Sequence, residues 1–395
     1  MIIAEKPTHP GPIAGKATPR CRHFGVCGGC RWQNVDYAAQ LRIKEAAVAD
    51  QLRGIMPPAA LRPIIPAPDP WYYRNKMEFA FAPPGDLGLH QRGQWRRVVN
   101  LEECFLQSET SATIVRDVRR FVSARGLSCY DPRTRAGLLR SLVIREAHAS
   151  GELMIGLVTT RGEFGDGDAL VDMLTGRYPR IVSIVRGITA GTAEINELER
   201  LFGRHHIVER VAGLEFKIEL TTFFQANTAQ AEGMIGLVDE FAALNGSEHV
   251  VDLYCGVGMF TLALARRAAQ VVGIDAARPS IEAARSNASA NGIRNAEFYA
   301  AEARALTVIA GAPHPDVLVL DPPRAGAGPR VMGQIGMLKP ATVIYVSCNP
   351  ATLSADVRTL LASGYAVAAA QPIDQFPQTT HVECIMKLSR EIAAV

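Results

Sequence analysis

The sequence predicts an α/β protein whose C-terminal half forms a mostly parallel sheet with an antiparallel last strand, preceded by a smaller α+β domain. From about residue 206 onward, short apolar runs alternate with helical runs, which is typical of a parallel sheet covered by helices on both faces. A glycine turn follows the first of these runs. Only DQFPQTT separates the last two apolar runs, and this connection is too short for a parallel crossover, so the final strand should run antiparallel.

Length and composition bound the class of protein. The 395 residues have an ordinary globular composition and suffice for two domains. No apolar run approaches the roughly 20 residues that span a bilayer, and the N-terminus lacks a signal-peptide pattern; we therefore expect a cytoplasmic monomer without a membrane partner. Lys and Arg outnumber Asp and Glu within residues 1–150, and the reverse holds for the remainder. This asymmetry agrees with a polyanionic partner for the front half, and also with chance.

Three segments are expected along the chain. Residues 1–20 are rich in Pro, Gly and Ala without periodicity, which predicts a flexible tail. Residues 21–205 are assigned to the α+β domain, with a helix over 37–55 and, from Trp71, short strands, hairpins and two further helices. Its strands include 71–81, 152–160 and 181–189. Residues 206–395 are assigned to the domain with the parallel sheet.

The turn after the first strand of that domain indicates a nucleoside cofactor. In DLYCGVGMF, Gly256 and Gly258 allow the backbone to approach a ligand. Asp275 ends the next strand, where an acidic side chain can accept hydrogen bonds from ribose hydroxyls. A dinucleotide site normally has a third glycine beside the pyrophosphate, and GVGMFTLA lacks one. This favours S-adenosylmethionine, which has no phosphate.

Three reactive side chains are expected at the same edge of the sheet. Asp321 and Cys348 end the fourth and fifth strands, and Glu383 begins the antiparallel last strand. A thiolate that adds to carbon 6 of a uracil makes carbon 5 nucleophilic toward a methyl donor, and a carboxylate can then remove the carbon-5 proton. A cysteine near a strand end is commonly a packing residue, as we expect for Cys255 and Cys384. The SCNP segment at this edge favours a nucleophile for Cys348.

A second group of cysteines indicates a metal site. Cys21, Cys27 and Cys30 provide three thiolates, and a fourth ligand must come from a distant segment. Spacing alone does not separate structural zinc from an iron–sulfur cluster, because both accept four cysteines.

Taken together, these motifs resemble the bacterial RNA 5-methyluridine methyltransferases, which are class I, Rossmann-like enzymes acting on 23S ribosomal or transfer RNA. The resemblance runs from CRHFGVCGGCRWQ to HVECIMKL. It implies methylation of uracil C5 in RNA, with 23S rRNA favoured and tRNA uridine 54 as the alternative. It also implies Cys348 as nucleophile and Glu383 as base. The implied cofactor contacts are Gln225, Tyr254, Asp275, Asp321 and, as a weaker candidate, Glu302.

The resemblance also bears on the metal and on RNA binding. Family members carry a [4Fe–4S] cluster whose fourth ligand matches Cys104, and zinc is the alternative. Many members begin with an RNA-binding β-barrel, for which the residues before Cys21 leave no room, so RNA contact is expected elsewhere. WYYRNKMEFAF combines aromatic residues with Arg74 and Lys76 on an expected strand, which suits RNA stacking and phosphate contact. A half-buried strand with a solvated face explains the same pattern.

Four other functions fit the sequence less well. An adenine-N6 methyltransferase would place an aromatic residue where Arg324 follows DPP, and a cytosine-5 RNA enzyme commonly has a second cysteine there. A radical S-adenosylmethionine enzyme would space its three cysteines differently. A non-catalytic iron–sulfur RNA-binding protein would leave Cys348 and Glu383 without a role.

Overall fold

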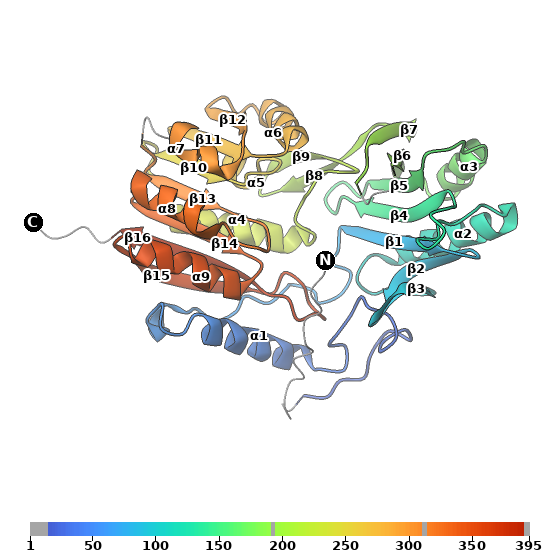
Figure 1. Ribbon diagram of the computed structural model, residues 1–395, viewed down its shortest axis with the longest axis horizontal. Helices are drawn as coiled ribbons and strands as arrows, with labels where there is room; N and C mark the ends of the chain where they lie inside the picture. The colour runs from blue at the N-terminus through green and yellow to red at the C-terminus, as the bar shows by residue number, and fades with distance from the viewer. Residues whose placement is uncertain (1–14, 191–193, 310–313, 391–395) are drawn as a thin grey trace, which may run out of the picture.

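Two seven-stranded sheets and a two-stranded hairpin make up the computed structural model, which describes residues 15–190, 194–309 and 314–390 (Figure 1). Residues 1–14 of the predicted tail lie outside the described residues. Lys16 forms an antiparallel bridge with Val35, and the Ala17 N–H donates to the Asn34 carbonyl at 3.1 Å. The chain therefore enters the fold alongside the segment that carries the first cysteines.

The first sheet has the strand order β3-β2-β1-β4-β5-β6-β7. Its strands are β1 Lys76–Ala82, β2 Asp86–Gln91, β3 Gln94–Asn100, β4 Leu139–Glu146, β5 Leu153–Thr160, β6 Ile181–Thr189 and β7 Glu197–Gly203. Neighbouring strands are antiparallel except β5 and β6, which are parallel and joined through α3, Gly167–Arg177. The other helix, α2, Glu109–Arg125, begins at Ser108, whose hydroxyl caps the Ser111 N–H, and ends at the left-handed Gly126. Both helices expected in this region are present.

The strand expected from Trp71 begins later, at Lys76. Before it, the Tyr72 N–H donates to the Phe105 carbonyl and the Arg74 N–H to the Leu106 carbonyl, at 2.7 and 2.8 Å. Tyr72 has a φ of 52°, which is incompatible with an extended strand. This part of the prediction was wrong because the segment pairs with a distant loop, so Arg74 precedes the sheet while Lys76 lies on it.

The second sheet has the order β12-β11-β10-β13-β14-β16-β15. Its strands are β10 His249–Leu253, β11 Gln270–Asp275, β12 Ala296–Ala300, β13 Val317–Leu320, β14 Thr342–Ser347, β15 Tyr365–Ile373 and β16 Glu383–Arg390. The β10, β11, β12, β13 and β14 ladders are parallel, and β16 pairs antiparallel with both β14 and β15. The predicted parallel sheet with one antiparallel last strand is confirmed.

Helices cover both faces of this sheet. Within β13, Val317 and Val319 join one hydrophobic cluster, whereas Leu318 and Leu320 join another. Because strand side chains alternate between faces, this strand is buried on both sides, which explains its uninterrupted apolar sequence. The first face is covered by α4 Thr228–Ala242, α5 Met259–Ala265 and α6 Arg278–Ala290, and the second by α7 Leu306–Ile309, α8 Gly328–Leu338 and α9 Pro350–Leu361.

The helix expected over residues 37–55 is α1, Tyr37–Gln51, and it packs against α9 and β15 of the second sheet (Figure 1). Val48 and Leu52 are fully buried within the cluster on that face. The N-terminal segment therefore crosses from the cysteine-bearing loop to the C-terminal sheet. β7 ends at Gly203 and β8 begins at His206, on either side of the predicted boundary at residue 205.

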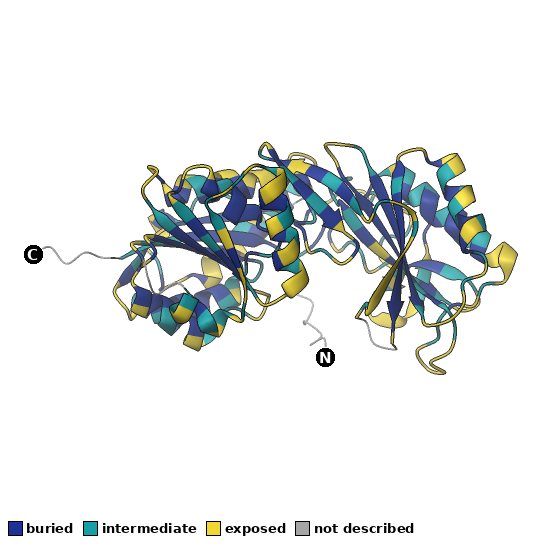
Figure 2. Ribbon diagram, turned by 90° about the horizontal axis from the view of Figure 1, so that it is seen from above, coloured by how far each residue is buried: buried dark blue, intermediate teal, exposed yellow. Residues whose placement is uncertain are grey.

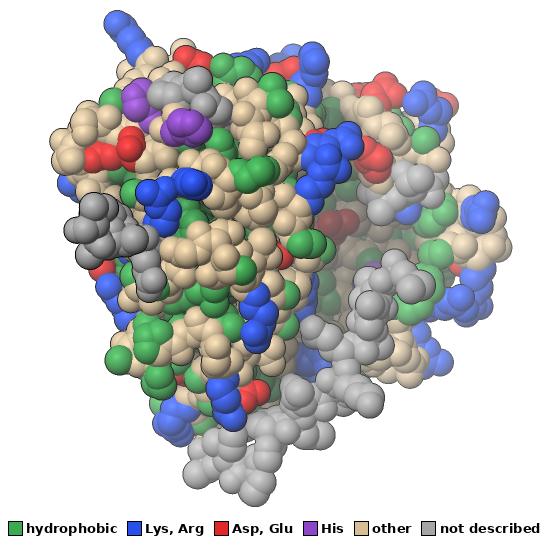
Figure 3. Space-filling view, turned by 60° about the vertical axis from the view of Figure 1, so that its left-hand side comes forward, with side chains coloured by type: hydrophobic (Ala, Val, Ile, Leu, Met, Phe, Trp, Pro, Cys, Tyr) green, Lys and Arg blue, Asp and Glu red, His purple; other side chains and the backbone are tan. Residues whose placement is uncertain are grey.

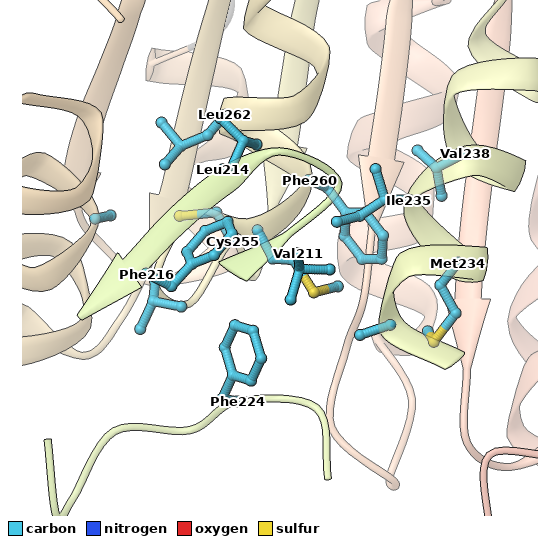
Figure 4. Close-up of a cluster of buried hydrophobic side chains, with 14 of the residues drawn as sticks. Val211, Leu214, Phe216, Phe224, Met234, Ile235, Val238, Cys255, Phe260 and Leu262 are labelled. Carbon is cyan, nitrogen blue, oxygen red and sulfur yellow. The ribbon is translucent and has the colours of Figure 1, made fainter. Parts of the chain in front are cut away.

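One hydrophobic cluster is shared by the two sheets. The hairpin of β8 His206–Val211 and β9 Leu214–Glu219 contributes Val211, Leu214 and Phe216 to it. These residues meet Phe224 and the side chains of α4 and α5 (Figure 4). Val143 and Met154 of the first sheet belong to the same cluster. Buried strand positions continue through both halves of the molecule (Figure 2), which holds the two sheets together around a common core.

Candidate functional site

The candidate site lies where the parallel strands of the second sheet end. The chain runs from β10 to β11 and β12 on one side and continues at β13 on the other, so the order reverses between β10 and β13. Ligands of open α/β sheets bind outside the carboxyl ends of the strands at such a reversal. Tyr254 follows β10, Asp321 follows β13, and Cys348 follows β14. The residues predicted from the sequence therefore occupy the edge at which this fold binds ligands.

The glycine turn after β10 is held open by Asp275. The Gly256 N–H donates to Asp275 Oδ2 at 3.0 Å, and the Ala277 N–H donates to Oδ1 at 2.8 Å. Gly256 has a φ of 54°, and a Cβ at this residue would meet no atom within 4 Å. Tyr254 also has a positive φ, 65°. The backbone at Gly256 therefore faces open space, which fits the close approach of a nucleoside, whereas Gly258 packs against Ala284, Leu262 and Phe298.

Cys348 and Glu383 are brought together by the antiparallel ladder. Ser347 of β14 pairs with Cys384 of β16, so the next step of the register sets Cys348 opposite Glu383. Burial raises the pKa of the Cys348 thiol to about 11, and the negative charges of Glu383 and Asp321 contribute. Glu383 is 4% exposed, and burial, assisted by the charge of Asp321, raises its pKa to about 8. The three groups lie within electrostatic reach of one another.

Asp321 connects this pair to a second buried carboxyl group. Burial raises the pKa of Asp321 to about 7, and the charge of Asp252 adds to the effect. Asp252 is itself buried, with Oδ2 accepting a hydrogen bond from the Thr261 hydroxyl at 2.5 Å. Burial raises the pKa of Asp252 to about 7 as well. Such raised carboxyl pKa values in a site are typical of proton-transfer groups.

Gln225 is held against Asp321 by a residue that sequence reasoning missed. The Gln225 Nε2 group donates to Asp321 Oδ2 at 3.3 Å, and Gln225 Oε1 accepts from Gln375 Nε2 at 3.1 Å. Gln375 is fully buried, and its own Oε1 has no hydrogen-bond partner among the described residues. No local pattern in DQFPQTT distinguished this glutamine from a loop residue.

The loop after Asp321 is fastened to α9 by Asp356, which the sequence also did not reveal. Asp356 Oδ2 accepts the Ala327 N–H at 2.7 Å and the Tyr345 hydroxyl at 2.6 Å. The Asn349 side chain, next to Cys348, donates to the Arg324 carbonyl at 3.3 Å. The loops that begin at Asp321 and Cys348 are thereby tied to each other.

Glu302 has a less favourable position than the other predicted cofactor residues. It follows β12 at the same sheet edge but is exposed, and it forms an ion pair with Arg304 at 3.0 Å. Cys255 and Cys384 are buried in the two hydrophobic clusters, in agreement with a packing role.

The four predicted metal ligands share one neighbourhood. The charge of Cys104 raises the pKa of Cys21, Cys27 and Cys30, although burial is the largest cause in each case. The Gly29 N–H donates to Cys27 Sγ at 3.4 Å, and backbone N–H groups of Leu106 and Gln107 lower the pKa of Cys104. Among the described residues, however, no three His, Cys, Asp or Glu side chains converge as ligands of one metal ion. The thiol chemistry fits a cluster, and the metal site stays a prediction.

The cysteine-bearing loop also contacts the segment that leads into Glu383. The N–H groups of Arg31 and Trp32 both donate to the Gln378 carbonyl, at 2.8 and 3.1 Å. The Gln40 amide of α1 donates to Gln378 Oε1 at 3.0 Å and accepts the Gln378 N–H at 3.0 Å. The N-terminal segment is thus part of the support for the candidate catalytic edge.

None of the helices within the described ranges is long and apolar enough to cross a membrane.

The sequence model of the family described as tRNA (uracil-5-)-methyltransferase matches residues 201–391. An uncharacterized RNA methyltransferase from Nitratidesulfovibrio vulgaris is 38% identical over 394 residues, covering 96% of this chain and 84% of that protein. Another from Porphyromonas gingivalis is 37% identical over 412 residues, covering 96% of this chain and 88% of that protein.

A solved structure shows the same architecture. The Pyrococcus abyssi tRNA (uracil-54, C5)-methyltransferase, in complex with S-adenosyl-L-homocysteine, superposes with a TM-score of 0.78 and 29% identity. The match covers 92% of this chain and 86% of that one. The chain is therefore an RNA methyltransferase and belongs to the RNA (uracil-5-)-methyltransferase family.

Proposed function

We propose that the protein methylates carbon 5 of a uridine in RNA, with Cys348 as covalent nucleophile and Glu383 as base. The observation that supports this most directly is the meeting of Cys348, Asp321 and Glu383 at one sheet edge, where each charge alters the pKa of a neighbour. S-adenosylmethionine, when bound, supplies a methyl group on a positively charged sulfur.

Cys348 activates the pyrimidine by conjugate addition. Its thiol, with a pKa near 11, is protonated at neutral pH and must lose its proton before it reacts. Asp321, with a pKa near 7, is a suitable acceptor for that proton. The sulfur then bonds to carbon 6, and electron density passes to carbon 5, which becomes the nucleophile for the methyl group.

Glu383 completes the cycle. Once carbon 5 carries the methyl group, its proton must leave so that the carbon 5–carbon 6 double bond can re-form and expel the Cys348 thiolate. A carboxylate with a pKa near 8 binds a proton more tightly than an ordinary glutamate. Only the ionised form can accept the carbon-5 proton, and its fraction rises as the pH approaches 8, so this step should become faster over that range.

The cofactor is assigned to the turn after β10 and the strand end beside it. Gly256 leaves open space, and each Asp275 oxygen keeps a lone pair beyond its backbone hydrogen bond, available to a ribose hydroxyl. Gln225, Tyr254 and Asp321 are proposed to complete the site, and Glu302 to approach its adenine end.

The cysteine group is proposed to hold a [4Fe–4S] cluster through Cys21, Cys27, Cys30 and Cys104, with zinc as the alternative. Its role would be structural, because methyl transfer needs no electron transfer. The cluster would fasten the loop whose Arg31 and Trp32 contact Gln378. Iron, sulfide and zinc analysis of protein purified without oxygen, with its visible absorption spectrum, separates the two metals.

The proposed target is 23S ribosomal RNA, as the sequence resemblance implies. Transfer RNA at uridine 54 is a second candidate, favoured by the likeness to the Pyrococcus abyssi enzyme. Nucleoside mass spectrometry on the separated RNAs of a deletion strain should show 5-methyluridine lost from one of them, and the lost position can then be mapped. Unchanged 5-methyluridine in both RNAs would contradict the proposal.

A further inference from the structure

A cavity of about 470 Å³ lies beside the segment that leads into Glu383. Most of its lining comes from three parts of the chain: Thr379, Thr380 and His381 before β16; Arg74, Lys76, Met77 and Glu78 around the start of β1; and Gly28, Gly29 and Arg31 of the cysteine-bearing loop. The cavity is therefore formed between the first sheet and the catalytic edge of the second. Figure 3 shows a hollow in the surface, with Lys and Arg side chains at its margin.

The polar lining of this cavity is mainly cationic. Arg31, Arg74 and Lys76 contribute positive charges, against the single carboxylate of Glu78. Within the described part of the chain, none of the three cations forms an ion pair. The buried Nε of Arg74 likewise has no hydrogen-bond partner there. The charge of Glu78 acts on Lys76, but three cations against one carboxylate in a concave site still favour an anionic ligand.

Arg74 is oriented by aromatic neighbours. Its guanidinium lies 5.8 Å from the ring centroid of Tyr73 and 5.6 Å from that of Phe376. The Tyr73 hydroxyl donates to the Pro377 carbonyl at 3.0 Å. These contacts hold the guanidinium between β1 and the loop before Glu383 without neutralising its charge, so its position is fixed before any ligand binds.

The rest of the lining is apolar. Met77, Leu89 and Leu106 form part of the wall. A ligand that fits has one anionic group and one flat apolar group, and a nucleotide combines a phosphate with a base that packs on such surfaces. The volume is in the range of small-ligand pockets, which is about 300–1,000 Å³.

The cavity lies close enough to Glu383 to hold the nucleotide next to the proposed target. His381 lines it, and only Val382 separates His381 from Glu383, so about 7 Å of extended chain connects cavity and base. A uridine that reaches Cys348 must leave its stack, which unstacks its neighbours as well. We propose that this cavity binds an unpaired nucleotide adjacent to the target uridine, with its phosphate at Arg31, Arg74 and Lys76 and its base against Met77, Leu89 and Leu106. This inference rests on the proposed function.

The test measures RNA and cofactor binding separately. Arg74→Gln and Lys76→Gln are compared with wild type and with Arg97→Gln, which removes an exposed arginine of β3 outside the cavity. The probe is a synthetic RNA of the mapped site. We expect each cavity variant to raise KM for RNA about tenfold and to reduce the slope of log affinity against log salt by about 0.7. KM for S-adenosylmethionine and calorimetric binding of S-adenosylhomocysteine should be unchanged, which verifies folding.

A second arm locates the phosphate. One phosphate linkage beside the target uridine is replaced by an uncharged methylphosphonate. This RNA should bind to wild type about tenfold more weakly than the unmodified RNA, whereas Arg74→Gln should bind the two RNAs almost equally. The inference is overturned if the cavity variants behave like Arg97→Gln. It is also overturned if, at every linkage, the loss of affinity from the methylphosphonate and the loss from Arg74→Gln multiply, as independent changes do. In that case mass spectrometry would still detect methylation of carbon 5, and the proposed function would remain intact. RNA binding that depends on the cavity without any 5-methyluridine product would reject the function alone.

Discussion

Cys348 and Glu383 each lie one residue beyond the Ser347–Cys384 pair that ends the β14–β16 ladder, and the charge of Glu383 acts on the Cys348 thiol. β14 runs toward the catalytic edge and β16 runs away from it, so a strand end and a strand beginning meet. Nucleophile and base therefore come from different strands, and their contributions can be separated by substitution.

Cys348→Ala should abolish covalent capture of a modified RNA. With 5-fluorouridine at the mapped site, carbon 5 has no proton for Glu383 to remove after methylation, so wild type should accumulate a protein–RNA adduct that survives denaturing electrophoresis. Cys348→Ala should form none and lose at least about 10³-fold in turnover, because the addition step is gone. Cys129→Ala, which removes a buried cysteine between α2 and β4 in the hydrophobic cluster of the first sheet, is the control and should form the adduct. An adduct with Cys348→Ala would exclude this nucleophile.

Glu383→Gln should stop the reaction one step later. The amide cannot accept the carbon-5 proton, so turnover should fall by about 10²–10⁴-fold. Addition and methyl transfer do not need this base, and ordinary RNA should therefore remain attached to the protein with its methyl group already in place. Mass spectrometry of the complex after nuclease digestion measures that group. Free methylated product at the wild-type rate would show that another group removes the proton.

The same carboxyl group should make the stability of the ligand-free protein depend on pH. Burial raises the pKa of Glu383 from 4.5 to about 8, so between these values the folded state holds a proton that the unfolded state has released. Stability is then lost as pH rises through this window, by up to about 1.4 kcal/mol per pH unit. Glu383→Gln removes the effect, so the Tm of the variant relative to wild type should increase between pH 6 and pH 8. A difference that is constant with pH would contradict the raised pKa.

Local sequence patterns predicted the parts of this protein that depend on local physics. The uninterrupted apolar run of β13 reports burial on both faces, and the glycine turn at Gly256 reports backbone conformation, so the sheet and its functional edge could be predicted. The placement of α1 on the second sheet could not be predicted in this way, because it depends on contacts with residues far away in the sequence. The same applies to the late start of β1, which depends on hydrogen bonds from Tyr72 and Arg74 to the Phe105–Leu106 loop.

Gln375→Leu should weaken cofactor binding although it replaces none of the proposed cofactor contacts. It removes the hydrogen bond to Gln225 Oε1, and Gln225 then loses the orientation that points its Nε2 group at Asp321. We expect about tenfold weaker binding of S-adenosylhomocysteine by calorimetry. The stability loss should lie at the lower end of about 1–3 kcal/mol, because Gln225 Oε1 loses its donor while the unpaired Gln375 Oε1 is removed.

Gln371→Leu is the matched control for that change. Gln371 is also buried, and its Nε2 group donates to the Pro63 carbonyl at 2.6 Å, away from Gln225. It should lower stability by a similar amount while leaving calorimetric affinity unchanged. Equal losses of affinity in both variants would mean that Gln375 acts only through general stability.

The Lys44–Asp374 ion pair should be the most sensitive contact between α1 and the catalytic edge. Both side chains are 0% exposed, with Nζ 2.5 Å from Oδ1, and Nζ also donates to the Phe376 carbonyl at 3.0 Å. Lys44→Met would leave the Asp374 carboxylate buried without a counter-charge, and we expect a loss of about 3–5 kcal/mol in urea unfolding. Because Asp374 begins the loop that leads to Glu383, methyl transfer should fall as well.

The double substitution Lys44→Met with Asp374→Leu decides what the pair contributes. Removing both charges removes the uncompensated carboxylate, so most of the stability should return, since buried pairs are commonly replaceable by apolar residues. Arg53→Met, which breaks an exposed ion pair with Asp50 just after α1, should cost no more than about 1 kcal/mol. If methyl transfer stays low while stability returns, the pair positions the loop before Glu383. If both return together, its contribution is to stability alone.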